Sequence, residues 1–212
     1  MNKKELHLTI HMKGKLKGIL SINTSSLKNP FCNSIGCRHL ARKDRKKKTI
    51  CEYCYAEKNE KLRKQLEACL EHNTEMLTTR ILKDEEIPLL NNAFVRFHSF
   101  GELVNDIHVQ NFLNIAKKNP QTIFCLMTKR YNLIMKHPKL KNIIYIASSP
   151  LLNTPIQNKT VLEYFDKTFT VYEHDNACVK KININCHGKD CIKCQNCYTT
   201  KGSKNINEIL RK

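Results

Sequence analysis

The chain has 212 residues, 41% of them hydrophobic, with six glycines and six prolines, which argues for one domain with an ordinary core and against long disordered stretches. Its 37 basic and 19 acidic residues give a net charge of +18, which favours a polyanionic partner such as DNA or RNA. The same excess of lysine is common in proteins from AT-rich genomes. No apolar run is long enough for a membrane span and the N-terminus has no apolar secretory segment, so we expect a cytoplasmic protein without a membrane partner.

The first part of the chain combines a strand pair, a cysteine-rich stretch and a long helix. Apolar residues alternate at residues 5–12 and again at 17–23, which predicts two strands joined as a hairpin around Gly14. A polar loop then leads into the cysteine-rich stretch at residues 32–55. From about residue 52 to residue 82, apolar side chains recur at three- and four-residue steps, which predicts a long helix.

The remainder alternates strands with helices. Strands are predicted at residues 93–99, 122–128, 142–148 and 169–173, and helices at 104–118 and 131–137, with a third unit covering 150–166.

Strands that alternate with helices imply βα units and a parallel sheet, so the predicted fold class is α/β. One parallel strand would precede the cysteine-rich stretch and four would follow it, as a partial (β/α) barrel or an open parallel sheet. Reactive groups in both arrangements collect at the C-terminal ends of the strands, where we expect the cysteine-rich loops. Residues 1–176 would form this core, and residues 177–212 a C-terminal metal-binding segment packed on it.

Eleven cysteines are many for a reducing compartment, where CxxC pairs are more often metal ligands or redox centres than disulfides. Eight of them form two groups. The first group is Cys32, Cys37, Cys51 and Cys54, and the second is Cys186, Cys191, Cys194 and Cys197. Of the others, Cys69 and Cys125 fall in a helical and a strand pattern, and we interpret them as small buried hydrophobic residues.

The second group has the three-residue steps of ferredoxin-type sequences, in which successive CxxC steps wrap a 4Fe–4S cluster. A structural zinc site more often uses two separated CxxC pairs. We therefore favour a 4Fe–4S cluster over zinc, with one or two clusters in the chain.

The first group allows more than one ligand set. All four sulfurs could hold one zinc ion or one cluster. Alternatively, Cys37, Cys51 and Cys54 hold a cluster with one open iron site, while Cys32 is a bystander or joins the other group.

A strand, a cysteine-rich loop ending in CxxCY, a helix, and a strand ending in Ser-x-Gly-Glu together resemble the core of the radical S-adenosylmethionine proteins. The resemblance implies that three loop cysteines bind a 4Fe–4S cluster and that its fourth iron chelates S-adenosylmethionine. The Ser-x-Gly-Glu element, which starts at Ser99, would bind this cofactor, with Gly101 and Glu102 at its amino group. Tyr53 or Tyr55 would lie near its adenine. The thirteen residues between Cys37 and Cys51 form a longer spacer than is usual in that superfamily.

A closer resemblance, over most of the chain, is to the uncharacterised phage gene product 88 family. It rests on the Cys54–Tyr55–Ala56 element, the strand VRFHSFGE at 95–102, the Thr128–Lys129 strand end and the terminal CxxCxxC. The resemblance implies a phage or mobile-element origin, hence the host cytoplasm, and an iron–sulfur protein. It implies no established substrate.

Polar side chains near these elements complete the candidate site. Arg96 and His98 alternate with apolar residues on one strand and Lys129 ends the next, so these three are candidate catalytic residues near Glu102, unless the strand merely has a wet face. The spacer between Cys37 and Cys51 is strongly basic. It would either bind phosphates or form a solvated insertion. Its candidate nucleic-acid contacts are Arg42, Lys43, Arg45, Lys46, Lys47 and Lys48.

Three functions follow from these features. The first is a radical S-adenosylmethionine-like enzyme that acts on a nucleic acid or nucleotide and needs an electron donor. The second is a basic nucleic-acid-binding protein whose fold is stabilised by two structural zinc sites. The third is a non-catalytic iron–sulfur protein for electron transfer or sensing.

Overall fold

The computed structural model describes residues 5–35, 48–174, 182–188 and 190–210. In these ranges one sheet contains the strands β1 (Leu8–Ile10), β2 (Leu20–Ile22), β3 (Phe94–Phe97), β4 (Ile123–Thr128), β5 (Ile143–Ser148), β6 (Lys167–Tyr172) and β7 (Asn205–Ile209). The α-helices are α2 (Tyr55–Leu62), α3 (Lys64–Thr79), α4 (Asp106–Lys118), α5 (Tyr131–Ile134), α6 (Lys159–Tyr164) and α7 (Cys191–Cys194). Shorter helical turns are η1 (Phe31–Ile35), η2 (Ile50–Tyr53) and η3 (Asp84–Glu86).

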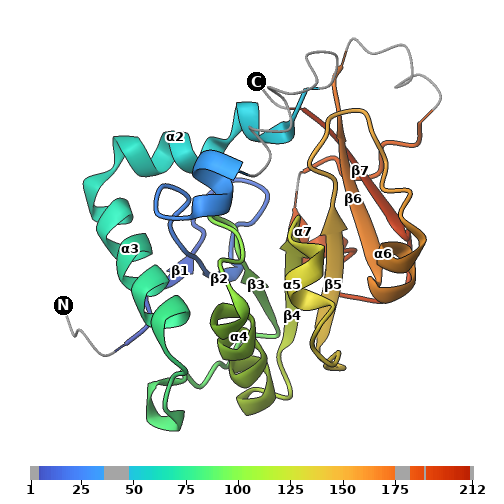
Figure 1. Cartoon of the computed structure of the whole chain (residues 1–212). Helices are drawn as coiled ribbons and strands as arrows, with labels where there is room; N and C mark the ends of the chain where they lie inside the picture. The colour runs from blue at the N-terminus through green and yellow to red at the C-terminus, as the bar shows by residue number, and fades with distance from the viewer. Residues whose placement is uncertain (1–4, 36–47, 175–181, 189, 211–212) are drawn as a thin grey trace.

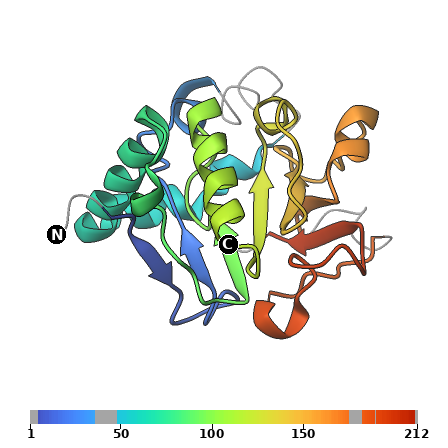
Figure 2. The same cartoon turned by 90° about the horizontal axis from the view of Figure 1, so that it is seen from below.

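The strands lie side by side in chain order, from β1 to β7 (Figure 1). β1 is antiparallel to β2, and all the other neighbours are parallel. Right-handed crossovers between parallel neighbours place successive helices on the same face when the strand order never reverses. Figure 2 shows α3, α4, α5 and α6 on one side of the sheet and the C-terminal segment around α7, which lies between β6 and β7, on the other. The fold is therefore α/β with an open, mostly parallel sheet that does not close into a barrel.

Alternate residues of the central strands pack into two separate cores. Phe124 and Tyr145 face the helices and pack in one core with Phe112 of α4. Cys125 and Ile146 face the opposite side and pack in the second core, which includes Tyr198 of the C-terminal segment. Because both faces are covered, β4 and β5 are almost continuously apolar, as predicted for buried parallel strands. The side of the sheet away from the helices is called the cleft face below.

The sequence correctly predicts the hairpin, since β1 pairs with β2 and Gly14 in the connection has φ +75°. The single long helix predicted for residues 52–82 is wrong, because Arg63 adopts extended backbone between α2 and α3, with φ −128° and ψ 93°. No helix in the described ranges is long and apolar enough to cross a bilayer.

The sixth parallel strand, β7, is missing from the sequence prediction, which had five. Its sequence, NINEI, contains only two apolar residues and carries a glutamate at a buried position. That residue, Glu208, is buried because its carboxylate pairs with the Lys15 ammonium at 2.7 Å. The end of the C-terminal segment thus belongs to the same sheet as the core.

Candidate functional site

A cleft of about 1580 Å³ lies beside the C-terminal ends of the parallel strands. Its walls come from the hairpin around residues 11–16, the segment 50–62, the end of β3 with the following loop to Glu102, and residues 208–210 of β7. Active sites of parallel α/β sheets are found at this edge, because the loops that leave the strands converge there.

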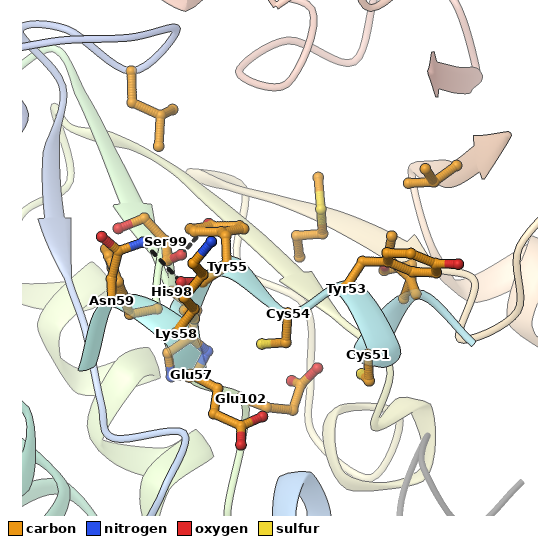
Figure 3. A pocket seen from close by; sticks show the side chains of 18 of the residues that line it. Cys51, Tyr53, Cys54, Tyr55, Glu57, Lys58, Asn59, His98, Ser99 and Glu102 are labelled. Atoms are coloured by element: carbon orange, nitrogen blue, oxygen red, sulfur yellow. Dashed lines mark hydrogen bonds between the residues drawn. The ribbon is translucent and has the colours of Figure 1, made fainter. Parts of the chain in front are cut away.

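Three cysteines of the first group converge beside this cleft. Cys51 in η2 and Cys54 before α2 line the cleft, and Figure 3 shows both near Glu102. Burial raises the pKa of the Cys32 thiol, and nearby Glu102, Cys51 and Cys54 raise it further, while Lys129 lowers it. Charges shift a pKa in this way only when they are close, so Cys32 lies near Cys51, Cys54 and Glu102.

Cys32 is thus near the other two described cysteines of the first group, and both ligand sets for this group stay predictions. Cys37 and the basic residues Arg42, Lys43, Arg45, Lys46 and Lys47 lie outside the described residues. In the described ranges, no three His, Cys, Asp or Glu side chains are arranged to hold one metal ion. Thiols must lose their protons before they can bind a metal, and three of them beside an open cleft suit a soft metal or an iron–sulfur cluster.

The loop that carries Cys32 is held in place by buried polar contacts. The Asn29 side chain donates to the Glu102 carbonyl at 2.8 Å and accepts from the Phe31 amide at 2.9 Å. The Arg130 guanidinium lies 5.1 Å from the centre of the Phe31 ring. These contacts fix η1, which contains Cys32, against the ends of β3 and β4.

Glu60 of α2 anchors the start of the same loop. Its carboxylate is fully buried and accepts hydrogen bonds from the Ser25 hydroxyl, the Ser26 amide at 2.8 Å and the Ser26 hydroxyl at 2.6 Å. We expect Glu60→Ala to lower the free energy of unfolding by about 2–4 kcal/mol, because it leaves buried donors without an acceptor. Urea denaturation followed by circular dichroism measures this loss.

The matched control for that experiment is Glu57→Ala, on the same helix. Glu57 pairs with Lys61 at 2.6 Å across one helical turn, and such a surface pair contributes about 0.5 kcal/mol. Equal losses for the two variants would contradict the role given to Glu60.

The far end of the cysteine loop is attached to the exit of β5. Thr49 forms an isolated bridge with Leu151, and the Ile50 amide donates to the Pro150 carbonyl at 3.0 Å. The Lys48 ammonium, one of the predicted phosphate contacts, pairs with Glu173 at 2.9 Å. The described residues of this stretch therefore follow β2 at one end and lie beside the exit of β5 at the other.

Glu102 is almost fully buried and its carboxylate is well satisfied. Oε1 accepts from the Leu103 amide at 2.9 Å and the Thr128 hydroxyl at 2.5 Å, and Oε2 accepts from the Lys129 amide at 2.9 Å. A carboxylate can accept about four hydrogen bonds, so among the described residues one position on Oε2 is left for a ligand. Glu102 thus joins the ends of β3 and β4 and still lines the cleft.

The other residues of the Ser-x-Gly-Glu element are held by neighbouring backbone. Gly101 has φ +85°, and a Cβ there would lie 2.4 Å from the Thr24 carbonyl oxygen, so only glycine fits. The Ser99 amide and hydroxyl both donate to the Asn23 side chain at 2.8 Å. Ser99 and Gly101 both line the cleft. The contacts above fix this part of the loop after β3 in place.

The two tyrosines proposed as adenine contacts differ in how their side chains are held. The Tyr55 hydroxyl donates to the Ser99 carbonyl and its ring packs edge-on against Phe100, so this ring is fixed in the wall of the cleft (Figure 3). Tyr53 lies on the other side of Cys54 and is 40% exposed. Tyr55 is more exposed, at 57%, so exposure does not single out either ring as the adenine contact.

The side chains of the three candidate catalytic residues do not all lie on the same side of the sheet. Arg96 lies on the cleft face, where its guanidinium donates to the His98 carbonyl at 3.1 Å. Lys129 also lines the cleft. His98 is at its edge, but its backbone has φ +66° and its ring packs against His108 and Phe112 on the helix side. Simple strand alternation predicted that Arg96 and His98 would share a face, and the left-handed residue after β3 breaks that alternation.

The buried histidine pair makes the fold sensitive to acid. Burial lowers the pKa of His108 to about 3, and burial followed by the nearby charge of His108 lowers the pKa of His98. Both are neutral in the folded protein, whereas the unfolded chain binds their protons below about pH 6.5. We therefore expect the free energy of unfolding to fall by about 1.5 kcal/mol from His108 alone between about pH 6.5 and pH 5. Urea unfolding at both pH values measures this, and an unchanged pH dependence in His108→Gln would contradict it.

The second cysteine group lies elsewhere than at the strand ends where we predicted it. Cys186 pairs with Glu208 beside β7, and the Cys191 amide donates to the Lys15 carbonyl at 2.8 Å. Cys197 packs on the cleft face of the sheet, whereas Cys194 is exposed. Cys125 is fully buried, as predicted, and Cys69 is half-buried on α3.

Comparisons of the chain with known protein families, curated proteins and solved structures found no match. The resemblances to radical S-adenosylmethionine proteins and to the phage gene product 88 family therefore remain predictions.

Proposed function

We propose that the chain is an iron–sulfur protein of the radical S-adenosylmethionine type, acting on a nucleic acid or nucleotide. The observation that supports this proposal is that Cys51, Cys54 and Glu102 line one cleft, with Cys32 near all three. Three thiols next to an open cavity suit a cluster with one iron free for a ligand, at the sheet edge where parallel α/β proteins bind cofactors.

The residues of the cleft take complementary roles in this proposal. Three cysteines of the first group ligate the cluster, and the free position on Glu102 accepts from the amino group of the cofactor. The ring of Tyr53 or of Tyr55, both partly exposed, stacks on adenine. When bound, a reduced cluster supplies one electron that cleaves a carbon–sulfur bond of the sulfonium, and an external electron donor replaces that electron.

The charge of the cleft supports an anionic substrate. Among the described residues that line it, six are lysine or arginine and four are glutamate. Two of the glutamates are already engaged by lysines, Glu57 by Lys61 and Glu208 by Lys15. The remaining cations include Lys58, which suits a phosphate-bearing substrate.

Metal analysis of protein purified without oxygen tests the proposal. We expect a brown protein with about eight irons and eight sulfides, as two four-iron clusters require. A colourless protein with about two zincs would contradict it and would support the zinc-stapled binding protein instead. A protein with the expected iron that does not bind S-adenosylmethionine would support an electron-transfer or sensing role.

A further inference from the structure

The N-terminal hairpin holds a histidine in the wall of the cleft. The His11 amide donates to the Ile19 carbonyl at 3.3 Å, and the His11 carbonyl accepts from the Gly18 amide at 2.7 Å. The ring nitrogen Nε2 of His11 lies 2.8 Å from the Ser21 hydroxyl and 3.0 Å from the Ser99 hydroxyl. His11 lines the cleft, and these contacts hold its ring between β2 and the loop after β3.

The hydrogen bonds around Ser99 determine which nitrogen of His11 carries the proton. The Asn23 side-chain oxygen accepts from the amides of Ser99 and Phe100 at 2.8 and 3.1 Å, so backbone donors fix the orientation of this side chain. The Ser99 hydroxyl lies 2.8 Å from the same oxygen and must donate to it, because a carbonyl oxygen only accepts. That hydroxyl has no second proton, so its contact with His11 requires Nε2–H as the donor.

The other ring nitrogen of His11 is therefore an acceptor. Burial lowers the pKa of His11 and the nearby charge of Arg96 lowers it further, so the ring carries a single proton at neutral pH. With that proton on Nε2, Nδ1 has a lone pair, and it forms no hydrogen bond with any of the described residues. Nδ1 is thus the ring atom of His11 that remains for a ligand.

The strand register places Arg96 beside this histidine. Ser21, which contacts the His11 ring, is the direct neighbour of Arg96 across β2 and β3. Leu20 and Ile22, on either side of Ser21, pack in the core on the helix side, so Ser21 and Arg96 lie on the cleft face. The His11 ring and the Arg96 side chain therefore share one part of the cleft.

The Arg96 guanidinium is oriented and still has donors to offer. Its Nε donates to the His98 carbonyl at 3.1 Å, whereas Nη2 contacts the Met127 sulfur, a weak acceptor, at 3.7 Å. Across the described ranges, Arg96 pairs with no carboxylate and its Nη1 forms no hydrogen bond. A guanidinium in this state suits a phosphate, which it binds through two parallel hydrogen bonds.

Ser99 connects this part of the cleft to the wall that carries the first cysteine group. Its hydroxyl accepts from His11, and its carbonyl accepts from the Tyr55 hydroxyl (Figure 3). Tyr55 directly follows Cys54 in the chain. A ligand held by His11 and Arg96 would therefore lie close to the residues that we propose for the cofactor.

We propose that Arg96 and His11 form a subsite for a ribonucleotide, in which Arg96 binds the phosphate and Nδ1 of His11 accepts from the neighbouring ribose hydroxyl. A guanidinium only donates and Nδ1 only accepts, so the pair fits a ligand with an oxyanion next to a hydroxyl. In RNA the 2′-hydroxyl lies next to the 3′-phosphate, and DNA lacks this hydroxyl. The subsite selects RNA or a ribonucleotide over DNA, and the assignment of this ligand as the substrate rests on the proposed function above.

Isothermal titration calorimetry of the full chain with cytidine 3′-monophosphate and its 2′-deoxy analogue tests the subsite. We expect the wild-type protein to bind the ribonucleotide about tenfold more tightly, the effect of one hydrogen bond. Failure to bind the ribonucleotide, or equal affinity for both ligands, would overturn the inference.

Two substitutions assign the roles within the subsite. His11→Gln should bind both ligands with the affinity of the 2′-deoxy analogue, because the glutamine amide can replace Nε2–H toward Ser99 but puts no acceptor in the place of Nδ1. Arg96→Met should weaken both ligands by about tenfold or more, since it removes a charge-assisted hydrogen bond. An undiminished preference in His11→Gln, or unchanged affinity in Arg96→Met, would refute these roles.

Lys13→Met is the matched control for the lost charge. Lys13 is an exposed lysine that lines the same cleft. This variant should lower both affinities much less than Arg96→Met does. Equal losses would mean that the net charge of the cleft, and not Arg96, holds the phosphate.

A second measurement needs no substitution in the subsite. Nitrogen nuclear magnetic resonance of protein labelled with ¹⁵N in its histidines reads the tautomer of each ring, and the His11 signals are those missing from His11→Gln. We expect a neutral Nε2–H ring whose Nδ1 signal shifts when the ribonucleotide is added and stays in place with the 2′-deoxy analogue. A proton on Nδ1 of the unliganded protein would contradict the inference.

The same titrations separate this inference from the proposed function. The preference for the ribonucleotide should persist in Cys51→Ala/Cys54→Ala, because the subsite needs no metal. If the wild-type protein contains no iron but still prefers the ribonucleotide, the proposed function fails and the subsite stands. If it contains iron and binds S-adenosylmethionine but does not distinguish the two nucleotides, the subsite alone fails.

Discussion

Replacement of Cys51 and Cys54 by alanine is expected to halve the iron content and abolish binding of S-adenosylmethionine. Both cysteines line the cleft, and with Cys32 they are the described thiols of the first site. The double variant should keep about four irons, those of one cluster in the second group. Iron and sulfide analysis together with equilibrium dialysis of radiolabelled S-adenosylmethionine measures both effects.

The matched control is Cys69→Ala. Cys69 is a half-buried cysteine on α3 and lies outside both groups. This variant should keep its full iron content and its cofactor affinity. If the double variant instead retains full iron, or still binds S-adenosylmethionine as the wild-type protein does, the first site has been assigned wrongly.

Gly101→Ala is expected to be among the most damaging single substitutions for the fold. The backbone at Gly101 is left-handed, and the new Cβ would lie 2.4 Å from both the carbonyl oxygen and the side-chain oxygen of Thr24. Backbone strain and steric overlap together should cost about 3–5 kcal/mol. Because Thr24 follows β2 and Glu102 follows Gly101, the variant also disturbs the cleft. Urea denaturation measures the loss of stability.

Gly14→Ala separates the two contributions. Gly14 has nearly the same φ, +75°, but a Cβ there would meet nothing within 4 Å. Only the backbone strain remains, so the loss should be about 1–2 kcal/mol. A loss for Gly101→Ala no larger than this would mean that the loop after β2 can move away from Gly101 at little cost.

The alternation of strands and helices was predictable because the sequence carries it locally. β4 and β5 are apolar on both faces, and α4 has a regular apolar stripe, so their types and approximate limits follow from periodicity. β7 could not be found in this way. Its burial depends on the ion pair between Glu208 and Lys15, whose residues are almost 200 positions apart.

The candidate site was predictable in composition but not in arrangement. Cysteine spacing defines two groups along the sequence, whereas the packing of Cys125 in the same core as Cys186, Cys191 and Cys197 depends on distant segments. His98 was assigned to the wrong side because strand periodicity does not reveal a left-handed residue at a strand end. The buried role of Glu60 follows from its contact with Ser25 and Ser26, and the sequence has no separate signal for it.

The most direct test of the account is electron paramagnetic resonance of the reduced protein with and without S-adenosylmethionine. A cluster with one open iron site should give a spectrum that changes when the cofactor is added, because the ligands of that iron change. The change should disappear in Cys51→Ala/Cys54→Ala and persist in Cys194→Ser. A spectrum with full iron content that S-adenosylmethionine leaves unchanged would contradict the account.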